Sequence, residues 1–467
     1  MAKLEKFVEH KRDTFIAISN YVWDHPEIRY EEAQSSLHLM EALSQEGFTL
    51  TKNIANIPTA FMAQWGEGKP VIAFLGEYDA LPNLSQAAQS TTHAPLETGG
   101  HGHGCGHNLL GTGALAAAVS LKDYLQQTGT KGTVRFYGCP AEEGGSGKTY
   151  MTRAGAFDDV DAALTWHPGP VNATWSLSTL ANVQAAFKFT GRSAHAATSP
   201  HLGRSALDAV ELMNVGTNYL REHIIPQARV HYAVTNTGGI SPNVVQADAE
   251  VLYLIRAPKT EQLMAIYERI QNIAKGAAMM TGTEVEVVFD KACSNYVPLD
   301  SLSKLIADTM QDVGAAMYTD EEQAFAKALQ QTYTKEEMAA ASMGVPALAA
   351  ALTKPISDVV IPYFTSSIPL FGSTDVGDVS WKTPTGQCVM ATCAVGTTFH
   401  TWQFVTQGKT SYAHKGMLQV AKVLAEVGRK LIEEPSYLLQ IKAEHNQKVG
   451  EGYVCPIPAH VKPPVLS

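Results

Sequence analysis

The chain lacks the features of a nucleic-acid-binding, membrane or disulfide-rich protein. Its formal net charge of −10 argues against binding to nucleic acids or anionic membranes, because both attract a basic surface. No apolar run reaches the roughly 20 residues that span a bilayer, and the charged N-terminal segment does not resemble a signal peptide. Six cysteines in 467 residues are too few for a disulfide framework, so each is interpreted as a core residue or a metal ligand. These absences predict a cytoplasmic protein.

The length of the chain and its pattern of apolar residues predict more than one domain. Two helices are expected between Leu4 and about Gln45, and short apolar strands then alternate with helices, which is typical of an α/β domain with a mostly parallel sheet. Residues 182–295 show the order β-α-β-β-α-β of a ferredoxin-like α+β domain. Because residues suited to chemistry lie on both sides of it, this domain is predicted to be inserted into a catalytic domain formed by residues 1–181 and 296–467.

The first candidate site is a glycine-rich turn before a predicted helix, with the sequence GHGHGCGHNLLGTG. Cys105 and His107 can face one point there, and a thiolate and an imidazole are both ligands for zinc and similar ions. His101 and His103 are assigned to the loop rather than to the ligand set. The alternative is a flexible loop with incidental histidines. It is less favoured, because four residues of ligand type fall within seven positions.

Further candidates follow predicted strands. Glu142 and Glu143 stand in CPAEEGGSGK, His167 in TWHPG and His400 in VGTTFHTW. Because the carboxyl ends of parallel strands meet at one edge of a sheet, these side chains are expected to lie close together. The alternatives are a solvated acidic turn for the glutamates and a structural role for His167. His414 competes with His400 as the weaker candidate, and Cys139 is interpreted as a buried hydrophobic residue.

Five potential ligands are too many for one catalytic zinc with an open position. Cys105, His107, Glu143, His167 and His400 suit two divalent ions that share a bridging ligand, an arrangement that clamps an attacking water. One of two adjacent glutamates can then bind metal while the other stays free to move protons.

The motifs GHGCGHN, CPAEEG and TWHPG, together with SAHAATSPHLGRSALDAV in the predicted insertion, resemble the M20 family of metallopeptidases and amidohydrolases, in the branch that uses a cysteine ligand. The resemblance covers nearly the whole chain and is weakest between residues 315 and 368. It implies a two-metal catalytic domain with an inserted lid or dimerisation domain. It also implies that Cys105 bridges the ions, that His107, Glu143, His167 and His400 complete their ligand sets, and that Glu142 is the general base.

The resemblance assigns substrate contacts to the insertion. His195 resembles the family histidine that reaches across a dimer to the scissile carbonyl, and Asn243 and Arg256 match positions that hold polar groups of the substrate. In GEYDALP, Glu77 and Asp79 replace the histidine–aspartate pair of other branches. No metal ligand is therefore assigned to this segment, and Asp79 is expected to orient a neighbour or form a turn. A second departure is Asn108, which stands where many members of the cysteine branch have an aspartate.

The function implied is metal-dependent hydrolysis of the amide bond of p-aminobenzoyl-glutamate or a similar N-acyl amino acid or dipeptide with a free carboxylate. The expected partners are a second copy of the chain or a homologous subunit, and the alternative function is a weakly active subunit that supports such a homologue. A thiolate ligand favours zinc, whereas the resemblance places manganese slightly ahead. A zinc nucleobase deaminase is excluded, because His25-Pro26-Glu27 is not followed by P-C-x-x-C.

Overall fold

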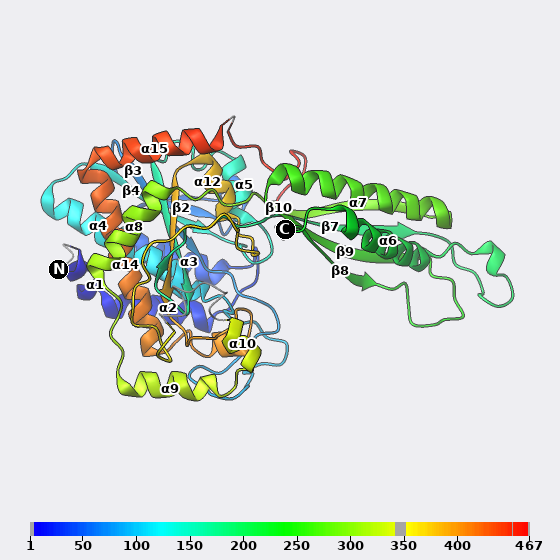
Figure 1. Cartoon of the computed structure of the whole chain (residues 1–467), viewed down its shortest axis with the longest axis horizontal. Coiled ribbons are helices and arrows are strands. Elements are labelled where there is room, and N and C mark those ends of the chain that lie inside the picture. The colour runs from blue at the N-terminus through cyan, green and yellow to red at the C-terminus, as the bar shows by residue number, and fades with distance from the viewer. Residues whose placement is uncertain (1–3, 341–351, 451, 466–467) are drawn as a thin grey trace.

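The computed structural model describes residues 4–340, 352–450 and 452–465, and these form a layered body from which a second unit projects (Figure 1). The body contains a seven-stranded sheet in the order β1-β2-β4-β3-β5-β11-β6. Strands β4, β3, β5 and β11 are parallel neighbours, and antiparallel strands flank them on both sides. The seven strands are β1 (Thr49–Lys52), β2 (Phe61–Glu67), β3 (Val71–Glu77), β4 (Gly132–Cys139), β5 (Ala162–Gly169), β6 (Ala173–Thr174) and β11 (Thr385–Ala391).

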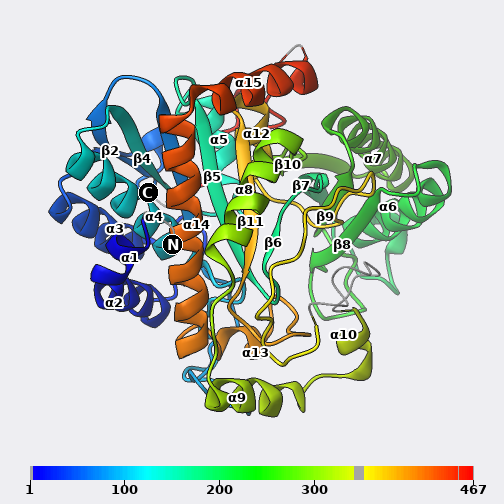
Figure 2. The ribbon, with the colours of Figure 1, turned by 60° about the vertical axis from the view of Figure 1, so that its left-hand side comes forward.

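Two long helices, α4 (His107–Thr128) and α14 (Ser411–Glu433), pack on each other and on this sheet, and they come from opposite sides of the insertion (Figure 2). Helix α4 lies unusually close to the sheet. A Cβ atom at Gly111 would lie 2.5 Å from the carbonyl oxygen of Glu77, and one at Gly113 would lie 2.8 Å from the Trp166 ring. Glycine is therefore needed at both positions, and the close approach brings the start of α4 to the end of β3.

The N-terminal region differs from its expected pair of helices. It forms three, α1 (Glu5–His10), α2 (Arg12–Asp24) and α3 (Ala33–Gln45). The first break falls at Lys11, whose φ and ψ of −110° and 13° leave the helical range. The Lys11 amine lies 2.5 Å from Glu46 and 2.7 Å from Asp123. Apolar residues keep their helical spacing on both sides of Lys11, so the hydrophobic pattern did not predict the break.

The projecting unit consists of a four-stranded antiparallel sheet, in the order β10-β7-β9-β8, and two helices. Its elements follow the predicted order β-α-β-β-α-β. They are β7 (Ala181–Thr190), α6 (Ala206–Leu220), β8 (Arg229–Asn236), β9 (Asp248–Ala257), α7 (Thr260–Thr281) and β10 (Glu284–Cys293). We propose residues 182–295 as the inserted domain and call it the lid.

Shorter elements complete the body. They are α5 (Gly147–Arg153), α8 (Asp300–Val313), α9 (Asp320–Gln330), α10 (Lys335–Ala340), α12 (Val376–Lys382), α13 (Trp402–Val405), α15 (Pro435–Val449) and the 3-10 turns Ile54–Asn56, Pro200–Leu202 and Arg221–His223. Helix α10 is followed by residues 341–351, which lie outside the described residues. In the described part of the chain, no helix combines the length and apolarity needed to cross a membrane.

Candidate metal centre

Side chains suited to metal binding converge at the carboxyl edge of the parallel strands, as the sequence predicted. Glu77 ends β3, Glu142 and Glu143 follow β4, and His167 lies near the end of β5. Cys105 and His107 join them because α4 starts beside β3. The topology therefore brings residues from four separate segments to one point.

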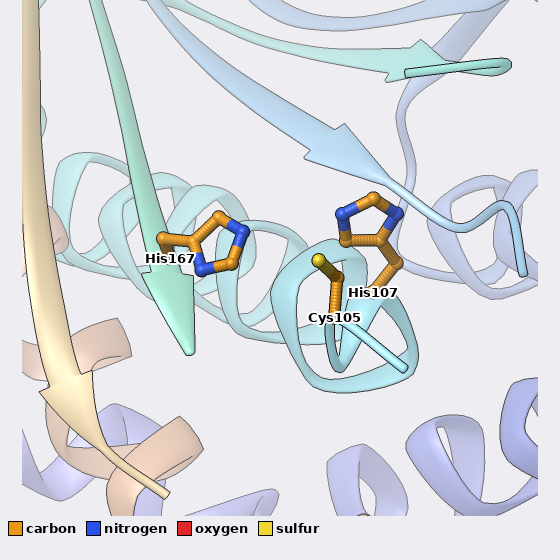
Figure 3. A group of neighbouring side chains, drawn as sticks. All are labelled: Cys105, His107 and His167. Carbon is orange, nitrogen blue, oxygen red and sulfur yellow. The ribbon is translucent and has the colours of Figure 1, made fainter. Parts of the chain in front are cut away.

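The predicted ligands form two groups that share Cys105. In the first, ligand atoms of Cys105, His107 and His167 all lie within 4.8 Å of one another (Figure 3). The second joins Cys105 to Glu143 and His400. The His400 Nε2 atom lies 3.1 Å from the Cys105 sulfur and 3.2 Å from Glu143 Oε2. A shared thiolate between two ligand groups is the arrangement that two bridged ions require.

The candidate ligand atoms suit the binding of cations, because some of them are buried and have no hydrogen bond to any described residue. His107 Nδ1 lies 2.9 Å from Asp79 Oδ1, so in the neutral imidazole that binds a metal this nitrogen carries the proton and Nε2 presents a lone pair. Both His107 Nε2 and Glu143 Oε1 are buried and unpaired among the described residues. His167 Nδ1 lies 2.7 Å from the Pro168 carbonyl oxygen, which leaves its Nε2 free for an ion.

Asp79 has the orienting position that the sequence suggested. Its Oδ1 holds the imidazole of His107, and its Oδ2 accepts a hydrogen bond of 2.8 Å from the backbone N–H of Glu143. One carboxylate thus fixes a member of each ligand group. Hydrogen bonds of this kind set the tautomer and direction of metal ligands.

Burial and charge separate the two adjacent glutamates. Burial raises the pKa of Glu142 well above its ordinary value, and the charges of Glu77 and Glu143 raise it further. Burial would also raise the pKa of Glu143, but the hydrogen bond from His400 and the charge of His107 lower it to about 2. Glu143 is therefore an anion suited to a cation, and Glu142 is a base able to take up a proton.

Other candidates have structural contacts instead. His103 is buried, with its Nε2 3.0 Å from the Val22 carbonyl oxygen, and His414 Nε2 lies 3.0 Å from Asn20 Oδ1. Asn108 donates to Ser19 Oγ and to the Gly408 carbonyl oxygen, both at 3.1 Å. The amide at position 108 thus ties α4 to two neighbouring segments, a role that needs a donor and that an aspartate would not supply.

The lid residues form a separate set. His195 and Val244 pair as an antiparallel bridge, and the Ala196 N–H donates to the Asn243 carbonyl oxygen at 3.0 Å, so His195 and Asn243 lie side by side on an exposed part of the lid. None of their hydrogen bonds to described residues reaches the candidate metal ligands.

Arg256 lies where the lid joins the body. It donates to Ser373 Oγ at 2.7 Å, across the junction between β9 and the body. Burial lowers its pKa, and the charges of Cys293 and Glu142 partly oppose this, so Arg256 is within electrostatic range of the proposed base. This places a permanent cation near Glu142.

Four further residues border the centre and were missed in the sequence. The ring centres of Phe399 and Trp175 lie 5.2 Å and 6.2 Å from that of His167. Lys148 and Asp375 form a buried ion pair of 2.6 Å. Two signals were available in the sequence, since Lys148 lies in the CPAEEGGSGK motif and Phe399 directly precedes His400 in VGTTFHTW.

The chain's similarity to known proteins agrees with this geometry. The family model described as "Peptidase family M20/M25/M40" matches residues 73–404. The chain belongs to this family. It is accordingly an M20 hydrolase, and the M20 assignment also accounts for the mixed α/β body and the additional unit.

Individual M20 relatives cover nearly the whole chain. A p-aminobenzoyl-glutamate hydrolase subunit of Escherichia coli is 52% identical over 99% of this chain and 98% of its own. The mouse Xaa-Arg dipeptidase is 28% identical over 93% of this chain and 89% of its own. A solved Bacillus subtilis structure, described as a dinuclear metal-binding M20 peptidase, has the same fold with a TM-score of 0.58 and 18% identity, covering 91% of this chain and 99% of the other.

Proposed function

We propose that this protein hydrolyses the amide bond of p-aminobenzoyl-glutamate or of a similar N-acyl amino acid with a free carboxylate. The observation that carries the proposal is the pair of candidate ligand groups that share Cys105, with Glu142 beside them as a partly buried carboxylate of raised pKa. The E. coli relative with 52% identity supports the choice of substrate.

Two divalent ions would be held by Cys105, His107, Glu143, His167 and His400, and we place Mn²⁺ slightly ahead of Zn²⁺. When bound, such ions polarise a carbonyl group and make a water molecule more acidic. Glu142 takes the proton from the attacking water and returns it to the nitrogen of the leaving amine. Its burial suits this exchange, because burial raises the pKa of the carboxyl toward the working pH.

The proposed substrate matches the surroundings of the centre. Arg256 offers a permanently charged, bidentate partner for the free carboxylate within electrostatic range of Glu142. The 39% exposed ring of Phe399 and the ring of Trp175 both lie beside His167. Aromatic rings at this edge suit an aromatic acyl group such as p-aminobenzoyl.

His195 completes the proposed site from a neighbouring subunit. It is exposed and hydrogen-bonded only within the lid among the described residues, yet amide hydrolysis needs a donor for the developing charge on the carbonyl oxygen. A dimer formed through the lid would carry His195 and Asn243 to the partner's metal centre. The second subunit is either another copy of this chain or a homologue, the latter supported by the word "subunit" in the relative's name. The six cysteines, all without disulfide bonds, suit the cytoplasm that we propose as its location.

Purified chain, stripped of metal and reloaded with Mn²⁺ or Zn²⁺, tests the proposal. We expect glutamate to be released from p-aminobenzoyl-glutamate only after metal is restored. Arginine should be released more slowly from Xaa-Arg dipeptides. If the chain binds two ions but stays inactive until a homologous subunit is added, the alternative of a supporting subunit is correct. Rapid hydrolysis of Xaa-Arg dipeptides without hydrolysis of p-aminobenzoyl-glutamate would contradict the choice of substrate.

A further inference from the structure

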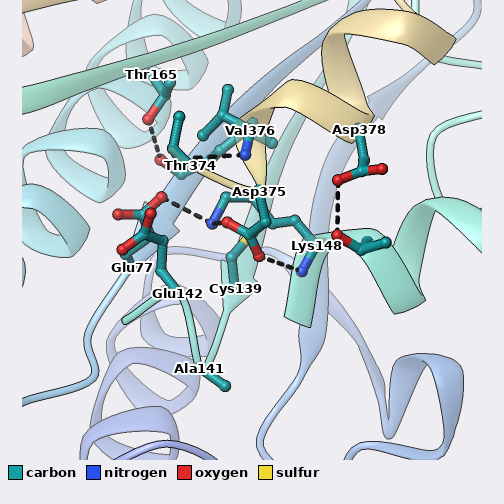
Figure 4. Close-up of polar contacts among 12 residues, drawn as sticks. Glu77, Cys139, Ala141, Glu142, Lys148, Thr165, Thr374, Asp375, Val376 and Asp378 are labelled. Atoms are coloured by element: carbon teal, nitrogen blue, oxygen red, sulfur yellow. Dashed lines mark hydrogen bonds and ion pairs between the residues drawn. The ribbon is translucent and has the colours of Figure 1, made fainter. Parts of the chain in front are cut away.

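The carboxylate of Glu77 divides its two oxygens between two different neighbours. Glu77 ends β3 and is buried. Its Oε1 lies 2.7 Å from Lys148 Nζ, while its Oε2 lies 3.3 Å from His107 Nε2. Figure 4 shows Glu77 beside Glu142, with Lys148 and Asp375 on its other side. One oxygen is therefore held by a cation, and the other faces the metal centre.

The atoms around Glu77 Oε2 need either a second proton on His107 or a cation to satisfy one another. The Nδ1 proton of His107 is directed to Asp79, so the Nε2 atom is an acceptor once the imidazole is neutral. Glu142 Oε2 also faces this nitrogen, at 3.9 Å. Among the described residues, Nε2 has no hydrogen-bond partner although His107 is fully buried. When His107 is neutral, three acceptors face one another in this mostly buried space, and they repel unless a cation lies between them.

These three atoms also meet the spacing of a ligand set. The ligand atoms of Glu77, His107 and Glu142 all lie within 4.8 Å of one another, and this group shares His107 with the group of Cys105 and His167. We propose that Glu77 is a sixth protein ligand, which binds through Oε2 the same ion as His107. The sequence had suggested no ligand in GEYDALP, and the proposal rests on the two-ion function given above.

Lys148 explains how Glu77 would bind through one oxygen. Its amine is fixed by Glu77 Oε1 and, at 2.6 Å, by Asp375 Oδ1, and Asp375 Oδ2 accepts from the Lys148 backbone N–H at 2.8 Å. A buried ion pair adds little to stability compared with apolar packing, so its presence here points to a role in the site. Lys148 keeps Oε1 occupied and directs Oε2 toward His107.

The charge balance of the centre favours the additional carboxylate. Without Glu77, the positive charge of two divalent cations would be opposed by only two anionic ligands, the Cys105 thiolate and the Glu143 carboxylate. Neutral imidazoles would complete the ligand sets. Buried charge must be compensated. Lys148 is balanced by Asp375, so the charge of Glu77 remains available to the ion.

The test measures metal binding as well as activity. Glu77→Gln keeps an oxygen for Lys148 while removing the ligand charge, and Asp375→Asn is the matched control, because it alters the same lysine without facing His107. Ions per chain would be counted by mass spectrometry after Mn²⁺ or Zn²⁺ loading, and dissociation constants measured by chelator competition. We expect Glu77→Gln to weaken one of the two ions at least 10–100-fold and to leave the other unchanged. Asp375→Asn should keep both ions near wild-type affinity.

Two results would overturn the proposal: wild-type affinity for both ions in Glu77→Gln, or equal weakening in Asp375→Asn. If Glu77→Gln fails to fold, Glu77→Asp keeps the charge beside Lys148 but shortens the side chain, and it should show the same selective loss of one ion. Co²⁺ loading gives an independent measure, since the visible spectrum should change in Glu77→Asp and not in Asp375→Asn. A wild-type chain that binds fewer than two ions would instead contradict the two-ion function itself.

Discussion

At the scale of single residues, adjacent side chains in this protein have opposite electrostatic surroundings. Glu142 and Glu143 are neighbours in the sequence, yet their pKa values shift in opposite directions. Burial and nearby carboxylates raise the pKa of Glu142, whereas His400 and His107 lower the pKa of Glu143. The difference arises because Glu143 turns toward the histidines and is fixed by Asp79 through its backbone N–H. Two identical residues thus suit two different tasks.

This difference can be tested by substitution. Glu142→Gln should keep both ions and lose activity by about 10²–10⁴-fold, because a general base is removed. Glu143→Ala should lose activity together with at least one ion. Metal analysis and steady-state kinetics on both variants check the assignment, and equal loss of metal in the two would show that both glutamates are ligands.

The proposed contact between Arg256 and the free carboxylate of the substrate can also be tested at the level of single residues. An acid substrate and its amide should differ strongly in rate for the wild-type enzyme, because only the acid forms a charge-assisted pair with Arg256. Arg256→Lys should reduce this preference, since lysine cannot bind a carboxylate through two parallel hydrogen bonds. The measurement is kcat/KM for p-aminobenzoyl-glutamate and its amidated analogue. Similar values for the acid and the amide in the wild type would refute the role of Arg256.

At the scale of secondary-structure elements, α8 is capped by a residue that lies far away in the sequence. Its N-cap residue, Leu299, has no polar side chain, and Glu444 on α15 accepts hydrogen bonds from the backbone N–H groups of Asp300 and Ser301 at 2.7 and 2.9 Å. The carboxylate satisfies two free donors at the positive end of the helix dipole. Helix α8 therefore depends on α15 for its start.

The cap makes part of the stability dependent on pH. Burial would raise the pKa of Glu444, but hydrogen bonds from Ser301 and the contact with Lys448 lower it to about 2 from 4.5. A lowered folded-state pKa stabilises the protein above the unfolded pKa, and this contribution is lost as the pH falls from about 4.5 toward 2. Glu444→Gln should cost about 1 kcal/mol at pH 7, as for a lost cap, and the deficit should shrink below pH 4.5.

Thermal melts of wild type and Glu444→Gln at pH 7, 5 and 3.5 check this expectation. Glu268, which is exposed on α7, provides the matched control Glu268→Gln. A deficit that is the same at all three pH values would mean that the carboxylate charge does not contribute to the cap.

At the scale of the whole molecule, the lid and the body each carry part of the proposed machinery. His195 and Asn243 lie on an exposed part of the lid, whereas the candidate metal ligands lie at the sheet edge of the body. A second subunit provides a direct way to bring the two sets together. Closed two-fold symmetry would then give each dimer two equivalent composite sites.

Mixing two inactive variants tests this arrangement. His195→Ala should keep its metal and fold but lose activity by about 10²–10³-fold, because a donor to the transition state is lost. Mixed with inactive Glu142→Ala, it should regain about a quarter of wild-type activity at equal amounts, since half the dimers are mixed and each holds one intact site. Subunit exchange must be shown separately by mass spectrometry of labelled chains. Exchange without recovered activity would mean that each site is built within one chain.

The sequence by itself determined the candidate metal ligands and the order of elements. Cys105, His107, Glu143 and His167 were found because each stands in a short motif at a strand or helix end, and parallel strands must bring such ends to one edge. The β-α-β-β-α-β order of the lid followed from hydrophobic periodicity alone. These features depend on the spacing of residues that are close together in the sequence, so they can be predicted from the sequence alone.

Only the tertiary structure decided which distant charges meet. Lys148 pairs with Glu77 and Asp375, and Glu444 caps α8, although no local pattern links these segments. Likewise, the break at Lys11 coincides with ion pairs to Glu46 and Asp123, which the hydrophobic pattern does not record. A buried charge is stable only beside its partner, and packing in three dimensions selects that partner. For this reason the sequence indicated the candidate ligands of the metal centre but not the buried charges that pair beside them.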